Sequence, residues 1–287
     1  MTPITRKEIL STRLLSNKAR LWAYDLHNLE YLNKPMRLFG SSQKVEKGSD
    51  KRSTYILYLQ PAGKVARGTL CPAAAASGCE SPCLISSGQL GMSTGQRAAT
   101  KRTILMLLRP HDFMKQLLSE IDRAERKAVR DGVPALFRLN GTSDIDFSPI
   151  IAQRPESDFY DYTKILSRVR KNTLPNYHLT FSGSMYSEAS RRALRKAMER
   201  GDNIAMAVNT KLLATDGPAL ANIIAHFPSF DETDIRPLDQ RGTLGLLTRK
   251  GSNKAERAAE DEKVNSFFIT ESNWASFYTT AILAGRD

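Results

Sequence analysis

The chain has 287 residues, of which 41% are hydrophobic and 25% charged, a composition that suits a globular protein with a sizeable core. Its formal net charge of +12 favours polyanionic partners, nucleic acid above all. The sequence offers neither an apolar run long enough to span a membrane nor the apolar core of a signal peptide near its start, so we expect a cytosolic protein with no membrane partner.

The basic charge is concentrated in the first quarter of the chain. Residues 1–70 contain thirteen Lys or Arg against five Asp or Glu, a balance of +8. We expect a basic, mostly helical N-terminal extension over residues 1–53 and a second region over residues 54–287. The extension could contact nucleic acid, and a solvated basic surface without a specific partner is the alternative.

Hydrophobic periodicity predicts strands and helices that alternate along the chain. Short apolar strands are expected over residues 54–59, 135–139, 158–162, 177–181, 203–208, 242–247 and 266–270. Amphipathic helices are expected over residues 5–32, 112–130, 187–200 and 217–226, with a polar loop over residues 40–53. Residues 95–102 predict a short basic helix, and residues 103–108 either a strand or a buried helical segment.

Strand, loop and helix recur at an interval typical of parallel β/α architecture. We therefore predict an α/β fold, a parallel β/α barrel or partial barrel, with a doubly wound open sheet as the alternative. In such folds the loops that follow the strands gather on one face, where ligands bind. The sequence has no Walker loop, no Gly-x-Gly-x-x-Gly and no His-x-His pair, which argues against nucleotide hydrolases, Rossmann dehydrogenases and nicking-type replication initiators.

All three cysteines, Cys71, Cys79 and Cys83, lie within thirteen residues. In a reducing compartment, clustered thiols indicate metal ligands or reactive groups rather than a disulfide. The seven-residue gap between the first two fits a zinc ribbon poorly. Three thiolates without a fourth suit a four-iron cluster that leaves one iron open to a small molecule. Zinc held with His178 or Asp144 as the fourth ligand, and three merely buried cysteines, are the alternatives.

Polar residues at strand ends supply the other candidates. Asn140, Ser143 and Asp144 could hydrogen-bond a ribose or a cofactor amine, with a self-contained turn as the alternative. Lys164 could neutralise a phosphate or a carboxylate, so Asp144 and Lys164 are the candidate catalytic residues. Ser182 lies in a small polar loop able to contact an anion, and it completes the candidate cofactor-binding set. We expect all of them on the same face as the cysteines.

Six blocks of residues together resemble the bacteriophage gene product 88 domain over about residues 54–270. These blocks are Cys71-Pro72 with Cys79 and Cys83, Arg138–Asp144, Phe159–Lys164, His178–Ser182, Asp231–Asp234 and Gly245–Gly251. The resemblance implies a phage or mobile-element origin, and hence the host cytoplasm. Its cysteine loop is similar to that of radical S-adenosylmethionine barrels, although their cysteines are three and two residues apart, against seven and three in this chain.

Together these features predict an iron–sulfur protein, similar to radical S-adenosylmethionine enzymes, that acts on nucleic acid or nucleotides. A 4Fe–4S cluster would use Cys71, Cys79 and Cys83 as ligands, with S-adenosylmethionine as the cofactor. The alternative is a non-catalytic nucleic-acid-binding protein in which zinc or the thiol loop itself has a structural role.

Overall fold

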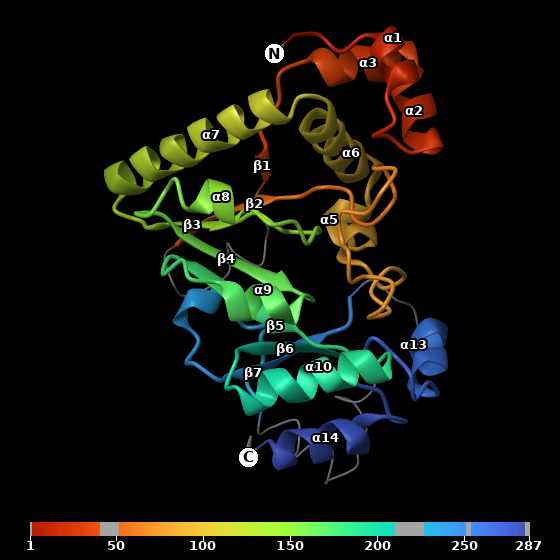
Figure 1. The fold of residues 1–287 in the computed structure, drawn as a ribbon, viewed down its shortest axis with the longest axis vertical. Helices are drawn as coiled ribbons and strands as arrows, with labels where there is room; N and C mark the ends of the chain where they lie inside the picture. The colour runs from red at the N-terminus through yellow and green to blue at the C-terminus, as the bar shows by residue number, and fades with distance from the viewer. Residues whose placement is uncertain (1, 41–51, 210–226, 251–253, 285–287) are drawn as a thin grey trace. The chain divides into compact units, whose positions relative to one another are not determined.

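The computed structural model describes most of the chain, drawn in colour in Figure 1. The described residues are 2–40, 52–209, 227–250 and 254–284. The helix predicted over residues 217–226 lies outside them, as does nearly all of the polar loop predicted over residues 40–53.

Seven strands form one sheet in which the spatial order follows the sequence, from β1 to β7. Strand β1 is antiparallel to β2, and the other pairings with a described register are parallel. The mostly parallel α/β class is therefore confirmed. The sheet is not closed among the described residues, so the predicted barrel or partial barrel is not confirmed. The strands are Phe39–Gly40 (β1), Ser53–Leu57 (β2), Ala135–Arg138 (β3), Asp158–Thr163 (β4), Tyr177–Ser182 (β5), Ile204–Val208 (β6) and Leu244–Thr248 (β7).

The chain divides into two compact units, and each contains segments distant in sequence. The first unit consists of Met1–Pro72 and Cys83–Phe159. The second consists of Ala73–Pro82 and Tyr160–Asp287. The predicted domain boundary after residue 53 stays a prediction.

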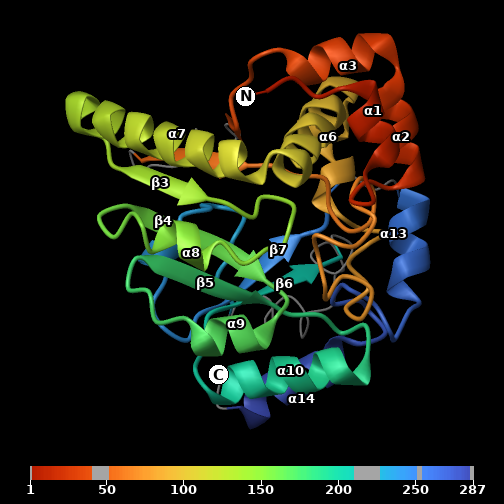
Figure 2. The same ribbon diagram turned by 45° about the horizontal axis from the view of Figure 1, so that its top comes forward.

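The first unit contains the described helices from α1 to α8 (Figure 2). They are α1 (Arg6–Ser11), α2 (Asn17–Tyr24), α3 (Leu26–Asn33), η1 (Leu84–Ser86), α5 (Gly88–Gly91), α6 (Ser93–Leu108), α7 (Pro110–Asp131) and α8 (Ser148–Ile151). Helix α7 follows its sequence pattern, because Phe113, Leu117 and Ile121 are fully buried on one face. It ends at Gly132, whose φ of 64° is left-handed.

The strands of the first unit pack through aromatic rings. Parallel β2 and β3 pair from Ser53 with Ala135 onward. Phe137 on β3 lies 5.5 Å from the ring of Tyr55 on β2 and 5.3 Å from that of Phe159 on β4, measured between ring centroids. Such contacts between neighbouring strands stabilise the sheet and fix its register.

Two predicted elements of the first unit differ from the structure. Residues 5–32 form three helices rather than one, because the side chains of Ser16 and Asp25 accept hydrogen bonds from backbone N–H groups and start new helices. Residues 95–108 form one continuous helix, α6, rather than a short basic helix followed by a strand. Its apolar run is buried as part of that helix, which decides between the two possibilities left open for it.

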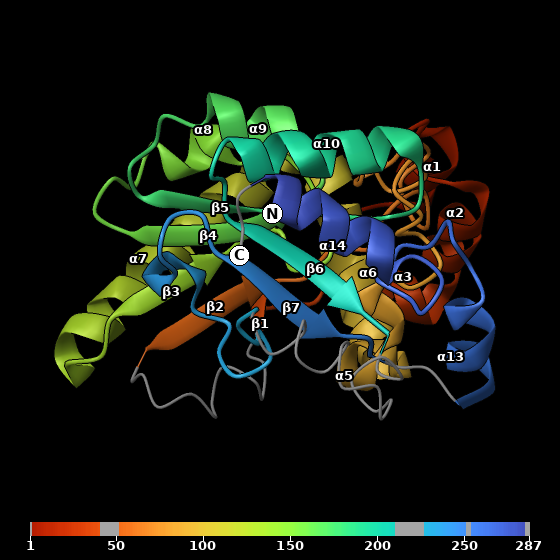
Figure 3. The ribbon, with the colours of Figure 1, turned by 90° about the horizontal axis from the view of Figure 1, so that it is seen from below.

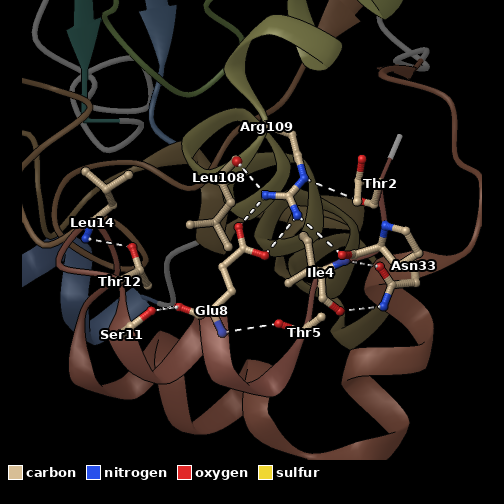
Figure 4. Close-up of polar contacts among 11 residues, drawn as sticks. Thr2, Ile4, Thr5, Glu8, Ser11, Thr12, Leu14, Asn33, Leu108 and Arg109 are labelled. Atoms are coloured by element: carbon tan, nitrogen blue, oxygen red, sulfur yellow. Dashed lines mark hydrogen bonds and ion pairs between the residues drawn. The ribbon is translucent and has the colours of Figure 1, made fainter.

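The N-terminal helices are fastened to the junction of α6 and α7 by Arg109 (Figure 4). Its guanidinium forms an ion pair with Glu8 on α1, through Nη1 and through Nη2 at 2.8 Å. The same guanidinium donates to the carbonyls of Thr2 and Pro3, each at 3.3 Å. The hydrogen bond from Arg109 lowers the pKa of Glu8, so this contact favours the charged carboxylate.

The second unit contains α9 (Leu166–Lys171), α10 (Glu188–Glu199), η2 (Arg236–Leu238), α13 (Lys254–Asp261) and α14 (Trp274–Leu283). Helices α9, α10 and α14 cover one side of the parallel strands (Figure 3). Leu194 on α10 and Phe277 on α14 bury themselves against Phe181, Ile204 and Met206 of the strands. The predicted N-cap of α10 is confirmed, since the Ser187 side chain accepts from the N–H of Ser190.

The last predicted strand, residues 266–270, does not form in the described part of the second unit. Only Ile269 makes a bridge, a parallel one to Val208 at the end of β6. The segment then turns, because the Asn273 carboxamide accepts from the N–H of Thr270 and donates to the carbonyl of Phe268. Local turn chemistry therefore outweighs the strand propensity of these residues.

Candidate functional site

The thiol segment, residues 71–83, contains three cysteines that are each half-buried. Cys71 and Cys83 belong to the first unit, and Cys79 belongs to the second. The convergence of the three thiols on one metal therefore stays a prediction. What the structure does show is how each end of the segment is held within its own unit.

In the first unit the start of the segment lies against the turn that follows β3. The Cys71 thiol donates to the carbonyl of Thr142, with Sγ 3.7 Å from the oxygen. The N–H of Asp144 donates to the carbonyl of Leu70 at 2.8 Å. Cys71, at the start of the segment, therefore lies beside the turn at residues 140–144, which follows a parallel strand.

The polar side chains of the turn after β3 hydrogen-bond within that turn. The buried carboxamide of Asn140 accepts from the Ser143 hydroxyl at 2.9 Å and from the N–H of Ile145 at 2.8 Å. It also donates to the Ile145 carbonyl at 2.9 Å. These contacts match the self-contained turn that was the alternative for Asn140 and Ser143. Asp144 is 9% exposed beside this turn.

In the second unit, residues 73–82 are fastened to the loop that follows β5. The Ser184 hydroxyl donates to the carbonyl of Ser77 at 2.7 Å. The hydroxyls of Ser187 and Ser190 donate to the carbonyl of Ala76 at 3.0 and 3.2 Å. Cys79 therefore belongs to a segment that is docked at the carboxyl end of a parallel strand, as the sequence predicts.

Gly78 allows this docking. Its φ of 68° is left-handed, a conformation that L-residues rarely adopt. A Cβ at this position would also come within 2.4 Å of the Tyr186 ring. The residue before Cys79 therefore has to be a glycine for both conformational and steric reasons.

Lys164 and Ser182 come together at the ends of β4 and β5. The Lys164 ammonium donates to the Ser182 hydroxyl at 2.9 Å and to its carbonyl at 3.2 Å. The same ammonium lies 4.3 Å from the centre of the Phe267 ring. The pairing of Lys164 with Ser182 agrees with the predicted gathering of strand ends.

Phe267 is a site residue that the sequence prediction missed. Its neighbour Phe268 is buried, with the guanidinium of Arg249 4.8 Å from the ring centre. Arg249 follows directly after β7. Phe267 and Phe268 therefore each make a cation–π contact with a residue at the end of a parallel strand. The only available signal was the aromatic pair itself, within a stretch that otherwise predicts a plain strand.

A second missed group consists of buried polar residues in the second unit. The Asp234 carboxylate accepts from the hydroxyls of Tyr160 and Tyr162, each at 3.1 Å. Arg236 is 2% exposed and forms an ion pair with Asp239 at 3.3 Å. Burial raises the pKa of Asp239, because a desolvated carboxylate is less stable than the neutral acid. The block at residues 231–234 therefore has a demonstrable structural role.

Among the residues that the structure describes, no group of three or more His, Cys, Asp or Glu side chains could hold a metal ion. The donor set itself still suits an iron–sulfur centre, because three cysteines without a fourth in the sequence would leave one iron open. The zinc alternatives that use His178 or Asp144 stay predictions.

Comparison with known proteins gave one match. The family model described as gene product 88 matches residues 33–264, which include the thiol segment and the strand ends described above. No curated protein and no solved structure matches the chain. Within the described residues, no helix combines the length and the apolar character needed to cross a membrane.

Proposed function

The chain belongs to the gene product 88 family, and from that premise we propose that it acts on nucleic acid or a nucleotide through a metal centre. Cys71, Cys79 and Cys83 would be the ligands of that centre. An iron–sulfur cluster with S-adenosylmethionine suits this donor set best, and zinc is the alternative. When bound, such a cluster supplies one-electron chemistry that protein side chains lack.

One observation carries the proposal: the segment that bears Cys79 is docked by three serine hydroxyls of the loop at the carboxyl end of β5 and of the first turn of α10. Loops at the carboxyl ends of parallel strands are where α/β proteins bind ligands and cofactors. A thiol segment with only a packing role would not need this location. Its fixed backbone also presents thiols that stay half-exposed.

Lys164 is the residue we propose for contact with the anionic part of the ligand. It lies on the Phe267 ring at a strand end of the same unit that docks the Cys79 segment. Proteins that bind single-stranded nucleic acid combine cations for phosphates with aromatic rings for bases. Ser182 would orient Lys164 through its hydroxyl. Asp144 would accept a hydrogen bond from the amine of the cofactor.

Metal analysis of protein purified without oxygen tests this function. We expect iron and acid-labile sulfide together with the broad visible absorbance of a cluster, and their loss in a variant with Cys71→Ser, Cys79→Ser and Cys83→Ser. Matched circular dichroism of the two proteins would show that the substitutions leave the fold intact. The absence of both iron and zinc from the wild-type protein would overturn the proposed metal centre.

The alternative is a non-catalytic nucleic-acid-binding protein with a structural zinc or thiol loop. A specific observation favours it, because Asn140 and Ser143 hydrogen-bond within their own turn. Two of the predicted cofactor contacts are thereby explained without a cofactor. Oligonucleotide binding that survives in the triple serine variant, with zinc rather than iron in the wild type, would establish this alternative.

A further inference from the structure

Helices α9 and α10 in the second unit carry a large excess of basic residues. Together they contain seven Arg or Lys and two Glu. Helix α7, the longest described helix, contains five of each sign and is therefore electrically balanced. The excess on α9 and α10 is therefore not shared by α7, and it makes these two helices a basic part of the second unit.

Four of these cations are exposed and free of ion pairs with described residues: Arg170, Lys171, Arg195 and Lys196. Arg192, by contrast, pairs with Glu188 at 3.4 Å. An exposed cluster of like charges repels itself, and this cost is offset when a polyanion replaces the solvent. The four residues are therefore available to an anionic partner.

The two helices present these cations on the same side of the unit. Leu166 and Val169 of α9 pack against the core cluster that buries Leu194, Ala197 and Met198 of α10. Both helices lie over the same side of the strands (Figure 3). Their apolar faces are turned to this shared core, and the exposed cations lie on the remaining faces of the two helices. We call these four residues the basic helical face.

The basic residues of α6 show the opposite arrangement in the first unit. Lys101 is fully buried, and Arg97 lies over the Tyr31 ring with its guanidinium 4.2 Å from the ring centre. Arg102 donates to the carbonyl of Arg37 at 3.3 Å. These cations are engaged by the protein itself, so they do not offer a comparable surface for phosphates.

We propose that the basic helical face binds the sugar–phosphate backbone of double-stranded nucleic acid without reading its sequence. Neither α9 nor α10 contains an aromatic residue, so the face has no platform on which unpaired bases could stack. Exposed Arg and Lys are what contact with a duplex backbone requires. This inference and the proposed function both name nucleic acid as the ligand, but the inference does not depend on the metal centre.

Binding of a DNA duplex of about 20 base pairs, measured over a series of salt concentrations, tests the basic helical face. The test variant is Arg195→Glu with Lys196→Glu. The matched control is Arg123→Glu with Arg126→Glu, which makes the same charge change at exposed positions of α7. Each lost phosphate contact lowers the slope of log K against log salt by about 0.9, so we expect a decrease of about 2 and at least tenfold weaker binding in the test variant.

The control should bind the duplex within about threefold of the wild type, because it changes the same net charge outside the basic helical face. A wild-type protein that does not bind the duplex, or a control weakened as much as the test variant, would overturn the inference. Glutamine versions of both pairs keep the test decisive if a charge reversal disturbs folding. Metal content is measured separately, so failure of the metal centre and failure of this surface remain distinguishable.

Discussion

The loops after β3 and β5 hold different parts of the thiol segment, but they differ in how they use their polar groups. In the first unit, Asn140 and Ser143 hydrogen-bond inside their own turn, and the Cys71 thiol donates to the backbone carbonyl of Thr142. In the second unit, serine side chains hold the segment directly. Ser182, at the end of β5, accepts a hydrogen bond from Lys164, which follows β4.

This difference separates residues that stabilise the fold from residues that can bind a ligand. A buried carboxamide that satisfies three partners stabilises the fold and has little left to offer a ligand. A lysine at a strand end, held by one serine and an aromatic ring, can exchange these contacts for an anion. Substitutions in the first loop should therefore cost stability, and those around Lys164 should cost binding.

The largest effect on stability is expected for Asn140→Ala. Loss of the buried carboxamide leaves the part-buried N–H and carbonyl of Ile145 and the Ser143 hydroxyl without this partner, which should lower the free energy of unfolding by about 3 kcal/mol. Ser182→Ala in the other loop is the control and should cost less than about 1 kcal/mol. Equal losses in urea denaturation would contradict the distinction between the two loops.

Gly78→Ala should have the next largest effect, about 2 kcal/mol, because it combines a left-handed backbone with a clash against Tyr186. Gly88 has a similar φ of 54° but no atom near its Cβ position. Gly88→Ala should therefore cost only the strain, about 1 kcal/mol. Adding Tyr186→Ala to Gly78→Ala should recover the steric part, and no recovery in thermal unfolding would argue against tight docking of the segment.

Lys101 extends the comparison to pH. Burial, with the nearby charges of Lys34 and Arg97, lowers its pKa to about 8 in the folded chain, from 10.5. Between these values the unfolded chain holds a proton that the folded chain has released, so stability should rise with pH. We expect a gain of about 1 to 2 kcal/mol from pH 7.5 to 9.5. The gain should be absent in Lys101→Met, and the same pH slope in both proteins would exclude a buried lysine as its source.

The smallest effect on stability is expected for Lys164→Met, less than about 1 kcal/mol, because its cation–π contact is partly exposed. Its affinity for a short single-stranded oligonucleotide should nevertheless fall about tenfold, the loss of one good charged contact. Lys115→Met on α7 provides an exposed lysine as the control and should bind normally. Normal binding by Lys164→Met would remove this residue from the proposed site.

Much of the fold was predictable because its elements have local signals. Strands β3 to β7 and helices α7 and α10 appear within a few residues of their predicted limits. Helix α6 was not fully predictable, since the Tyr31 ring and the carbonyls that receive Lys101 come from distant sequence. The run at residues 266–270 likewise depends on the turn made by Asn273.

The sequence predicted at which strand ends the candidate residues lie, but it predicted less well what each residue does there. Cys71 does lie beside the turn after β3, and Lys164 does meet Ser182. Nothing in the sequence distinguishes an Asn140 that hydrogen-bonds within its own turn from one that binds a ligand, because the distinction rests on three hydrogen bonds within the folded turn. Phe267 was missed because a cation reaches it from another part of the chain.

The parallel pairing of the sheet also sets an order of folding. Ser53 on β2 pairs with Ala135, 82 residues later, whereas Phe181 on β5 pairs with Ile204, only 23 residues later. Closing the longer loop costs about 1 kcal/mol more in chain entropy. The β5–β6 pair should therefore acquire protection from hydrogen exchange before the β2–β3 pair during refolding. A nascent chain reaches its first parallel pairing only after helices α6 and α7 have been synthesised.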